Sequence, residues 1–319
     1  MALKIAGTGG RLPEFVLDNH KLSTMVDTTE EWITTRTGIH TRRIITTETL
    51  LDLASGAAQD AISSAKCKAV DIDLIICATV LGDTLTPNVA SMVQKRIGAV
   101  CPAFDINAAC SGFVFALDIA AAYIKSGLAN RILLIGAEHI SNITDYTDRA
   151  SCILFGDGAG AVVVERGDNL LAHKLVTKGD DSILKITRMS GNFPHLDPSN
   201  TTSNQSLWMN GQEVYKFAVE ALIQIIHDVL DLAKLKIDDI DYFVPHQANK
   251  RIIEGASKRL GLSESKTLSN IAECGNTSSA CIPLMLDTNA RMGRFKPGDI
   301  LLLAAFGGGM ACGAAIIKW

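Results

Sequence analysis

The chain has 319 residues, of which 47% are hydrophobic and 5% aromatic, and it carries a formal net charge of −4. This length accommodates one large domain or two fused halves with an aliphatic core, and the charge gives no support for a nucleic-acid-binding protein. The eight cysteines are scattered without a C-x-x-C pair, so neither a zinc site nor a disulfide framework is indicated. We therefore expect no metal, no resident cofactor and a reducing, cytoplasmic location.

Strands and helices are predicted to alternate through the first half of the chain. Residues 3–8 have the pattern of a first strand, without the long apolar core of a signal peptide. Thr28, with Glu31 three residues later, resembles a capping box that would start a helix. Apolar spacing predicts the elements that follow. In order, they are a helix over 50–65, a strand over 72–80, a helix over 88–97, a strand near 104–107 with a helix to about 127, and strands over 131–136 and 161–165.

One stretch of this half, residues 104–117 (FDINAACSGFVFAL), is typical of a short buried strand, a sharp turn and an apolar helix. Cys110 lies where the helix should begin. The unpaired N–H groups and the positive dipole end of a helix favour a thiolate there, so Cys110 is a candidate nucleophile. A buried structural cysteine is the alternative, because a free cysteine also packs like a small hydrophobic residue.

The second half repeats the pattern of the first at a nearly constant distance. Pairing Leu74 with Tyr242 gives an offset of 242 − 74 = 168, and pairing Leu133 with Leu302 gives 302 − 133 = 169. Residues 270–276 echo the strand and turn around the candidate nucleophile. These offsets predict an internal duplication.

The duplication predicts two halves of similar fold, over residues 1–168 and 169–319. Because strands alternate with helices, we expect mainly parallel sheets with helices on both faces. Residues 166–210 fit the repeat poorly. They include a polar loop over 199–204, and an amphipathic helix over 214–232 follows.

An unbroken apolar or glycine run covers residues 300–317, near the lower length limit of a membrane span. Three glycines at 307–309 interrupt it, and glycine weakens a helix. The run is therefore predicted to form two buried strands joined by a glycine turn.

If the two halves pack face to face, their strand ends and helix starts should converge. The first half would contribute Cys110, and the second would contribute His246 at a strand end and Asn276 at the matching turn. A cysteine with a histidine and an asparagine from distant parts of the chain is a familiar set for nucleophilic catalysis. Taken alone, the histidine fits a buried or loop position, and the asparagine fits a turn or helix cap.

Four motifs resemble those of a known family. They are DINAACSGF at 105–113, VPHQAN at 244–249, GNTS at 275–278 and FGGG at 306–309, in this order. In these motifs, and from Trp32 to nearly the C-terminus, the chain resembles the β-ketoacyl-[acyl-carrier-protein] synthase III family of the thiolase superfamily. The resemblance implies a thiolase-like α/β fold of duplicated αβαβα layers, with two mainly parallel mixed sheets. It also implies a catalytic triad of Cys110, His246 and Asn276; elongating ketosynthases would show Cys-His-His instead.

The resemblance further implies the reaction of an acyltransferase. Cys110 would attack an acyl-CoA thioester, and the N–H groups of Cys110 and Gly308 would hold the oxyanion. Malonyl-[acyl-carrier protein] would then lose CO2, while neutral His246 and Asn276 donate hydrogen bonds to the enolate. Attack on the acyl-cysteine would give 3-oxoacyl-[acyl-carrier protein], the first condensation product of fatty-acid biosynthesis.

The resemblance also suggests how substrates are bound and that the protein is a homodimer. The implied CoA contacts are Trp32, Arg36 and Arg149. Acyl-carrier protein is acidic, and a basic helix face would steer it. The implied carrier-protein contacts are Arg251, Lys250 and Lys258. A partly buried aromatic anchor, a surface ion pair and a solvated helix face are the plainer explanations of these side chains.

Two alternatives stay open. The first is a ketosynthase-III-like condensing enzyme or acyltransferase of secondary metabolism. The second is a catalytically silent partner subunit, although such subunits lack the cysteine that Cys110 represents. The sequence does not specify the acyl-CoA starter; Thr86, at a position that borders the acyl pocket in the family, suggests a roomier pocket than an aromatic residue would.

Overall fold

Two β-sheets organise the chain in the computed structural model, which describes residues 2–186 and 206–319. The first sheet has the order β1(Ala2–Arg11), β7(Gly158–Gly167), β6(Arg131–Glu138), β4(Leu74–Ala78) and β5(Ala103–Ile106). The second has the order β8(Leu170–Thr177), β13(Ala311–Lys318), β12(Ile300–Gly307) and β11(Tyr242–Pro245). The four strands of the second sheet, taken from β8 to β11, therefore correspond in order to the first four strands of the first sheet, taken from β1 to β4.

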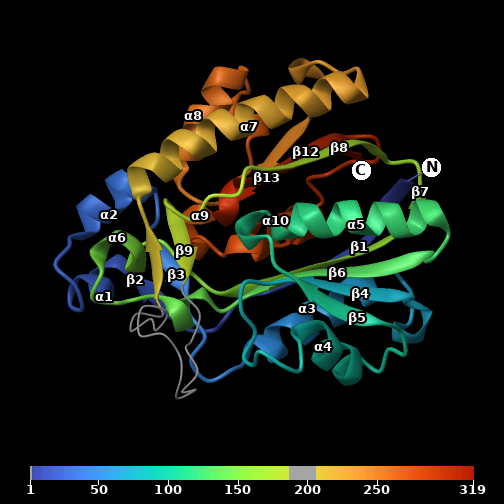
Figure 1. The fold of residues 1–319 in the computed structure, drawn as a ribbon, viewed down its shortest axis with the longest axis horizontal. Helices are drawn as coiled ribbons and strands as arrows, with labels where there is room; N and C mark the ends of the chain where they lie inside the picture. Colours follow the sequence, from blue (N-terminus) through green and yellow to red (C-terminus); the bar gives the residue numbers. More distant parts are fainter. Residues whose placement is uncertain (1, 187–205) are drawn as a thin grey trace, which may run out of the picture.

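Helices cover both faces of each sheet and complete five layers (Figure 1). Helices α5(Gly112–Ser126) and α10(Cys281–Arg291) lie between the sheets. Helices α3(Leu50–Ser64) and α4(Val89–Ile97) cover the outer face of the first sheet. Helices α7(Gly211–Ala233) and α8(Lys250–Leu260) cover the outer face of the second. The result is the αβαβα arrangement expected from the family resemblance.

The position of α5 explains its composition. Its sequence is almost wholly apolar, and Phe113, Val114 and Leu117 are each 1% exposed. A helix packed between two sheets has little solvent face, whereas α7 and α8 are amphipathic because one side of each faces water. The window Ala109–Ser126 is long and apolar enough to cross a membrane by composition, but half of it is buried inside the protein.

The remaining described elements lie at the edges of these layers. The helices and strands are β2(Val16–Asp18), α1(Asn19–Ser23), α2(Glu30–Thr37), β3(Thr41–Arg43), α6(Arg149–Cys152), β9(Leu184–Ile186), β10(Leu207–Met209) and α9(Ile271–Cys274). The short 3₁₀ helices among them are η1(Ala69–Asp71), η3(Ile140–Ile143), η5(Ile237–Asp239) and η6(Glu264–Lys266). The polar loop predicted at 199–204 lies outside the described residues.

The sheets are mixed, and the expectation of mainly parallel sheets is wrong in this respect. Strand β4 pairs in parallel with β5 and β6, and β11 pairs in parallel with β12. The pairs β1–β7, β6–β7, β12–β13 and β8–β13 are antiparallel. Only η8(Gly308–Met310) connects β12 to β13, and so short a connection permits an antiparallel hairpin but no parallel crossover. This hairpin is also the pair of strands and glycine turn predicted for 300–317.

Two local predictions are wrong. The cap of α2 is Thr29, not Thr28, because the Thr29 hydroxyl accepts the Trp32 N–H at 3.1 Å. Residues 270–276 do not repeat the strand before Cys110. They form the short helix α9, after which Asn276 makes a single parallel bridge to Phe155.

Two pairs of corresponding elements in the two halves are separated by the same number of residues. Helix α10 begins 281 − 112 = 169 positions after α5, and β12 begins 300 − 131 = 169 positions after β6. Both chain ends lie at the same end of the molecule (Figure 1). The boundary between residues 168 and 169 remains a proposal, which falls between β7 and β8.

Candidate active site

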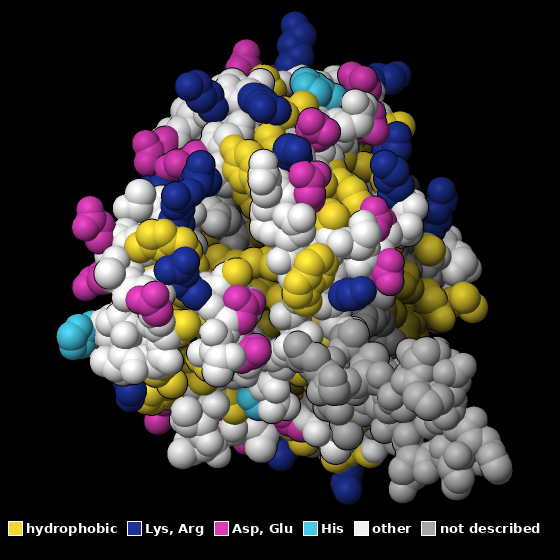
Figure 2. All heavy atoms as spheres, turned by 60° about the vertical axis from the view of Figure 1, so that its left-hand side comes forward, with side chains coloured by type: hydrophobic (Ala, Val, Ile, Leu, Met, Phe, Trp, Pro, Cys, Tyr) yellow, Lys and Arg dark blue, Asp and Glu magenta, His cyan; other side chains and the backbone are white. Residues whose placement is uncertain are grey.

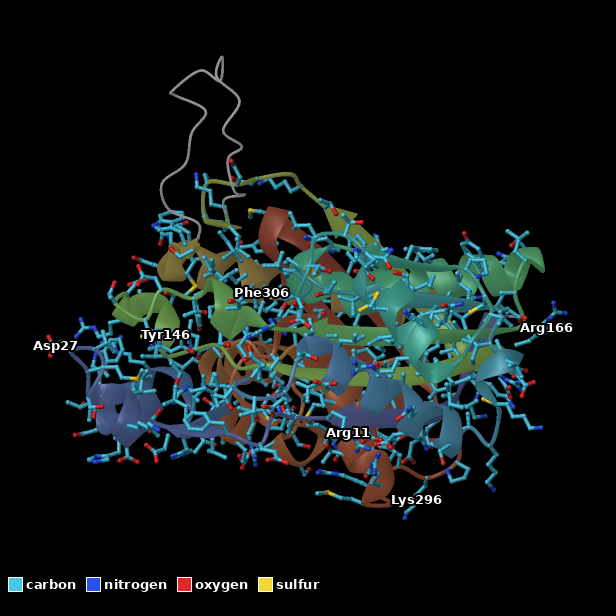
Figure 3. The ribbon with its side chains drawn as sticks, turned by 90° about the horizontal axis from the view of Figure 1, so that it is seen from below. Arg11, Asp27, Tyr146, Arg166, Lys296 and Phe306 are labelled. Carbon is cyan, nitrogen blue, oxygen red and sulfur yellow. The ribbon has the colours of Figure 1, made fainter. Side chains whose placement is uncertain are left out.

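A cavity of about 1150 Å³ lies where strand ends and helix starts of both halves meet. The described residues lining it include Cys110 from the first half and His246 and Asn276 from the second. The glycine turn 307–309 and Phe306 complete this part of the wall. Phe306 lies inside the molecule, whereas Arg166 and Lys296 project from its periphery (Figure 3). The structure thus brings the three residues of the predicted triad around one cavity.

Cys110 lies in a strained turn between β5 and α5. It is the middle residue of η2(Ala109–Ser111), and Ala109 has φ = +47°, which is uncommon for a residue other than glycine. The Asn107 Oδ1 accepts the Ala109 N–H at 3.0 Å and stabilises the turn. The turn leaves Cys110 half-buried at the cavity wall, two residues before Gly112, where α5 begins.

The electrostatic surroundings of Cys110 differ from the prediction. Burial, with a smaller contribution from the Glu138 carboxyl, raises the pKa of the Cys110 thiol to about 12, although a hydrogen bond with Ser278 counteracts part of this effect. The expectation that a helix start keeps Cys110 as a thiolate is therefore wrong. The 3₁₀ turn separates Cys110 from α5, and desolvation exceeds the stabilisation that the helix offers. The thiol keeps its proton at neutral pH and must lose it as it reacts.

His246 follows β11 and is 1% exposed. Its Nδ1 lies 3.0 Å from Cys281 Sγ. Its ring packs against the edge of Phe306, with centroids 5.3 Å apart and an interplanar angle of 68°. Burial lowers the pKa of His246 to about 3, so the imidazole is neutral at physiological pH. A neutral imidazole offers one N–H donor and one nitrogen acceptor.

Asn276 follows a glycine in the left-handed region, Gly275, with φ = +67°. Its backbone N–H donates to the Leu154 carbonyl at 2.8 Å, which fixes the residue against the first half of the chain. Its Oδ1 accepts the Ser278 N–H at 2.9 Å. Because the amide oxygen is engaged within the turn, the NH2 group is the part of the side chain left to face the cavity.

The glycine turn lies directly beside Cys110. A Cβ on Gly307 would come within 2.8 Å of the Cys110 nitrogen, so only glycine permits this approach. Gly308, the predicted oxyanion donor, lines the cavity together with Cys110. The sequence pointed to this glycine turn as a whole but not to Gly307 in particular, and its signal was the run of three glycines after a buried strand.

One residue that the sequence analysis missed is Glu138, at the end of β6. It is fully buried and accepts hydrogen bonds from the Val80 N–H at 3.0 Å, the Ser278 hydroxyl at 2.9 Å and the Ser279 N–H at 3.2 Å. Burial raises the pKa of Glu138 to about 7. The carboxyl joins β6 to η7(Ser278–Ala280), the turn that follows Asn276. A lone carboxylate ending an apolar strand was the available sequence signal.

The predicted CoA residues form a cluster at the edge of the cavity. The Arg149 guanidinium lies 4.8 Å, and that of Arg36 6.0 Å, from the centroid of the Trp32 ring. The Arg36 carbonyl accepts the Asn249 Nδ2–H at 3.2 Å, and Asn249 lines the cavity. Trp32 is half-buried and both arginines are exposed, and none of the three is among the described residues that line the cavity itself.

The predicted carrier-protein contacts lie on the exposed side of α8. Lys250, Arg251 and Lys258 are all exposed, and Lys250 pairs with Glu254 at 3.6 Å. The Arg251 guanidinium lies 6.0 Å from the Tyr215 ring centroid. On the face that includes α1 and α2, basic side chains lie interspersed with acidic and hydrophobic ones (Figure 2). Any steering of an acidic partner would therefore come from local cations rather than from the net charge.

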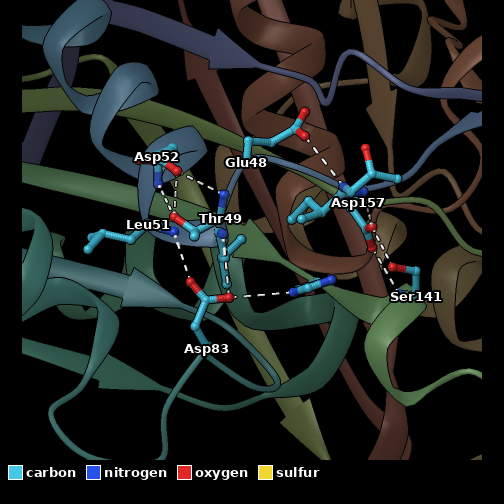
Figure 4. A network of polar contacts seen from close by, with 11 residues as sticks. Glu48, Thr49, Leu51, Asp52, Asp83, Ser141 and Asp157 are labelled. Carbon is cyan, nitrogen blue, oxygen red and sulfur yellow. Dashed lines mark hydrogen bonds and ion pairs between the residues drawn. The ribbon is translucent and has the colours of Figure 1, made fainter.

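Residues 82–85 form another part of the cavity wall and are anchored to α3. The Asp83 carboxylate accepts the Leu51 N–H at 3.2 Å and lies 3.5 Å from His139 Nδ1 (Figure 4). Leu85 lines the cavity although it is 81% exposed, whereas Thr86 is not among the described lining residues. The expectation for Thr86 is therefore not met at this cavity, where its neighbour Leu85 takes the place at the wall.

Known proteins match this chain over most of its length. A family model for 3-oxoacyl-[acyl-carrier-protein] synthase III matches residues 104–179, and the model of its C-terminal region matches residues 230–319. The chain is 44% identical to β-ketoacyl-[acyl-carrier-protein] synthase III of Clostridium acetobutylicum, across 100% of this chain and 99% of the relative. It is 46% identical to the protein of that name in Neisseria gonorrhoeae, across 99% of each.

Solved structures agree with the sequence relatives. The crystal structure of 3-oxoacyl-[acyl-carrier-protein] synthase III from Aquifex aeolicus superposes with a TM-score of 0.92 at 41% identity, across 99% of this chain and 100% of that chain. A priming β-ketosynthase from the R1128 polyketide biosynthetic pathway superposes with a TM-score of 0.91 at 33% identity, across 99% of this chain and 96% of that chain.

Proposed function

The chain belongs to the β-ketoacyl-[acyl-carrier-protein] synthase III family, and from this membership we propose how its own residues carry out the reaction. It is an acyltransferase of the condensing class and catalyses the initiating condensation of fatty-acid synthesis. Its substrates are an acyl-CoA starter and malonyl-[acyl-carrier protein], and its products are 3-oxoacyl-[acyl-carrier protein], CoA and CO2. It acts as a homodimer in the cytoplasm.

The first half-reaction transfers the acyl group to Cys110. The Cys110 sulfur attacks the thioester carbonyl, the bond to the CoA sulfur breaks, and the proton lost by Cys110 ends on the leaving CoA thiol. Because burial raises the pKa of Cys110 to about 12, this proton leaves as the new bond forms rather than beforehand. The N–H groups of Cys110 and Gly308 stabilise the oxyanion, and Gly307 permits their close approach.

The second half-reaction releases CO2 and forms the carbon–carbon bond. As malonyl-[acyl-carrier protein] loses CO2, negative charge develops on its thioester oxygen, and His246 and Asn276 donate hydrogen bonds to that oxygen. A neutral imidazole suits this role because a cationic one would also stabilise the carboxylate that must leave. The enolate carbon then attacks the acyl carbonyl, Cys110 leaves as a thiolate, and it takes up one proton from the solvent.

One observation supports this assignment above the others. Cys110 shares a cavity with two neutral side chains, and one polar atom of each is already engaged by the protein: His246 Nδ1 lies 3.0 Å from Cys281 Sγ, and Asn276 Oδ1 accepts the Ser278 N–H. Neither side chain brings a charge to the space above the nucleophile, and the Asn276 NH2 group remains as a donor. Such a site suits an enolate better than it suits hydrolysis, which requires a base for water.

Substrate delivery is assigned to the exposed clusters at the edge of the cavity. CoA binds against Trp32, Arg36 and Arg149, and both guanidinium groups already lie over the Trp32 ring. The acidic carrier protein docks on α8 through Arg251, with Lys250 and Lys258 contributing to the local positive field.

A priming condensing enzyme of secondary metabolism is the second candidate, favoured by the likeness to the polyketide priming ketosynthase. The two candidates share the chemistry of the site and differ in the starter acyl group. Turnover of two-carbon, four-carbon and branched five-carbon acyl-CoA substrates distinguishes them.

The test of the proposed function separates the two half-reactions. Incubation with acyl-CoA should add one acyl mass to the peptide that contains Cys110, and Cys110→Ala should abolish it. His246→Ala should retain acylation but lower malonyl decarboxylation by about 10²–10³-fold. An acyl group on another cysteine, or decarboxylation that survives His246→Ala at the wild-type rate, would contradict the assignment.

A further inference from the structure

Cys281, the first residue of α10, is a buried thiol against the side of His246 that faces away from its proposed donor function. Its Sγ lies 3.0 Å from His246 Nδ1 and accepts the Gln247 N–H at 3.5 Å. Cys281 is 0% exposed and His246 is 1% exposed. One sulfur atom thus binds two consecutive residues at the end of β11, and water is excluded from the contact.

The direction of the hydrogen bond at this contact decides what His246 can do. A neutral imidazole carries one N–H, on Nδ1 or on Nε2. If the thiol donates to Nδ1, the proton of the ring lies on Nε2, which can then donate a hydrogen bond. If Nδ1 donates to the sulfur, Nε2 carries a lone pair and can act only as an acceptor or a base.

The surroundings of the sulfur favour the first arrangement. Its lone pairs already accept the Gln247 N–H, whereas its own proton needs an acceptor, and Nδ1 is within reach. Burial raises the pKa of Cys281 well above its ordinary value, so this proton is present at physiological pH. A buried hydrogen-bond donor without an acceptor would lower the stability of the folded protein. The Phe306 ring, 5.3 Å from the imidazole centroid, restricts rotation of His246 from another side.

We propose that Cys281 is a positioning residue, whose thiol donates to Nδ1 and thereby holds His246 in the Nε2–H tautomer needed to stabilise the enolate. Asn276 is oriented by the same principle, since the Ser278 N–H occupies its Oδ1 and leaves its NH2 for the substrate. The consequence for catalysis rests on the proposed function, whereas the hydrogen bond is a property of the free protein.

Nitrogen NMR of the histidine rings tests the hydrogen bond without substrate. In 15N-histidine-labelled protein, His246 is assigned by the loss of its signals in His246→Gln. We expect protonated Nε2 and an Nδ1 resonance displaced by an accepted hydrogen bond. Cys281→Ala should return Nδ1 to the shift of a free acceptor, and Cys281→Ser should leave it bonded. A protonated Nδ1 in the wild type, or an Nδ1 shift unchanged in Cys281→Ala, would overturn the proposal.

Kinetics of the two half-reactions test the effect of the Cys281–His246 hydrogen bond on catalysis. Cys281→Ala should lower malonyl decarboxylation about 10-fold while acylation of Cys110 changes less than about 2-fold, and Cys281→Ser should restore most of the loss. Cys77→Ala is the matched control, because Cys77 is also 0% exposed but lies in β4 within the core against α3 and α4. If Cys281→Ala lowers the rates of both half-reactions equally, and Cys77→Ala lowers them to the same extent, the role of Cys281 is purely structural and the proposal is overturned.

The effect of His246→Gln on malonyl decarboxylation distinguishes a failure of the proposed function from a failure of the role proposed for Cys281. If His246→Gln leaves decarboxylation intact, the proposed function fails whatever the NMR shows. If His246→Gln abolishes decarboxylation but Cys281→Ala does not lower it, the proposed function stands and the role of Cys281 fails.

Discussion

Two turns at the cavity, residues 107–112 in the first half and 276–281 in the second, share one backbone design and differ in chemistry. Each begins with an asparagine whose Oδ1 accepts the N–H two residues later, at 3.0 Å in the first turn and 2.9 Å in the second. Each has a non-glycine residue in the left-handed region, with φ of +47° at Ala109 and +48° at Ser278. Each ends where a central helix begins.

The side chains on this shared backbone have diverged. Cys110 faces the cavity, whereas Ser279, 279 − 110 = 169 positions later, is 1% exposed and lies 2.7 Å from Glu138 Oε1. The Asn107 amide donates to the Val80 carbonyl at 3.3 Å, whereas the Asn276 amide is left for the cavity. A duplicated turn thus provides a nucleophile in one half and a hydrogen-bond donor in the other, because different side chains remain unengaged.

The two asparagines provide the sharpest test of this comparison. Asn276→Ala should lower malonyl decarboxylation by about 10²–10³-fold, because it removes a donor to the enolate, and should leave acylation of Cys110 nearly intact. Asn107→Ala is the matched change in the first turn. It should slow acylation of Cys110, whereas the decarboxylation rate of already acylated protein should stay within about 3-fold of the wild-type rate. Mass analysis of acylation and CO2 release measure the two steps. Equal loss of decarboxylation in both variants would remove the distinction between the turns.

Glu138 holds the second turn through Ser278 and Ser279, and its pKa predicts how stability depends on pH. Its pKa is raised to about 7 from 4.5, so its stabilising contribution is fully present below about pH 4.5 and is lost as the pH rises through about 7. At about 1.4 kcal/mol per pKa unit this amounts to at most about 3.5 kcal/mol. Glu138→Gln should remove this part of the pH dependence between pH 5 and 8, as measured by urea unfolding. The exposed Glu220 of α7 provides the control, since Glu220→Gln should retain the wild-type slope. An unchanged slope in Glu138→Gln would show that the carboxyl does not titrate in this range.

The smallest expected effect concerns the outer helices α8 and α4, which cover corresponding faces of the two sheets. Arg251→Glu on α8 should raise the KM for malonyl-[acyl-carrier protein] roughly 3- to 10-fold at low salt, because it reverses a local charge that attracts an acidic partner. The exposed Lys95 on α4 is the control, and Lys95→Glu should leave that KM unchanged. The KM for acyl-CoA should not change in either variant. Equal increases in the KM for both substrates would argue against docking on α8.

Periodicity and motifs were sufficient to predict most of the fold. Neighbouring residues alone were enough to predict the strands and glycine turn of 300–317 and the amphipathic helix α7. The spacing of hydrophobic residues along such an element follows directly from which of its faces is buried. The two offsets of 168 and 169 identified corresponding elements of the two sheets. The family resemblance, which the comparisons confirm, came from short motifs around residues that now line one cavity.

The sequence by itself determined which side chains were candidates; only the tertiary structure decided their environment. A helix start next to Cys110 suggested a thiolate, but the packing of two halves around it raises the pKa of the thiol. The partners that orient the site are distant in sequence, with Cys281 35 residues from His246 and Ser279 141 residues from Glu138. Desolvation and hydrogen-bond direction arise from groups brought together by folding, and neither is encoded in the spacing of neighbouring residues.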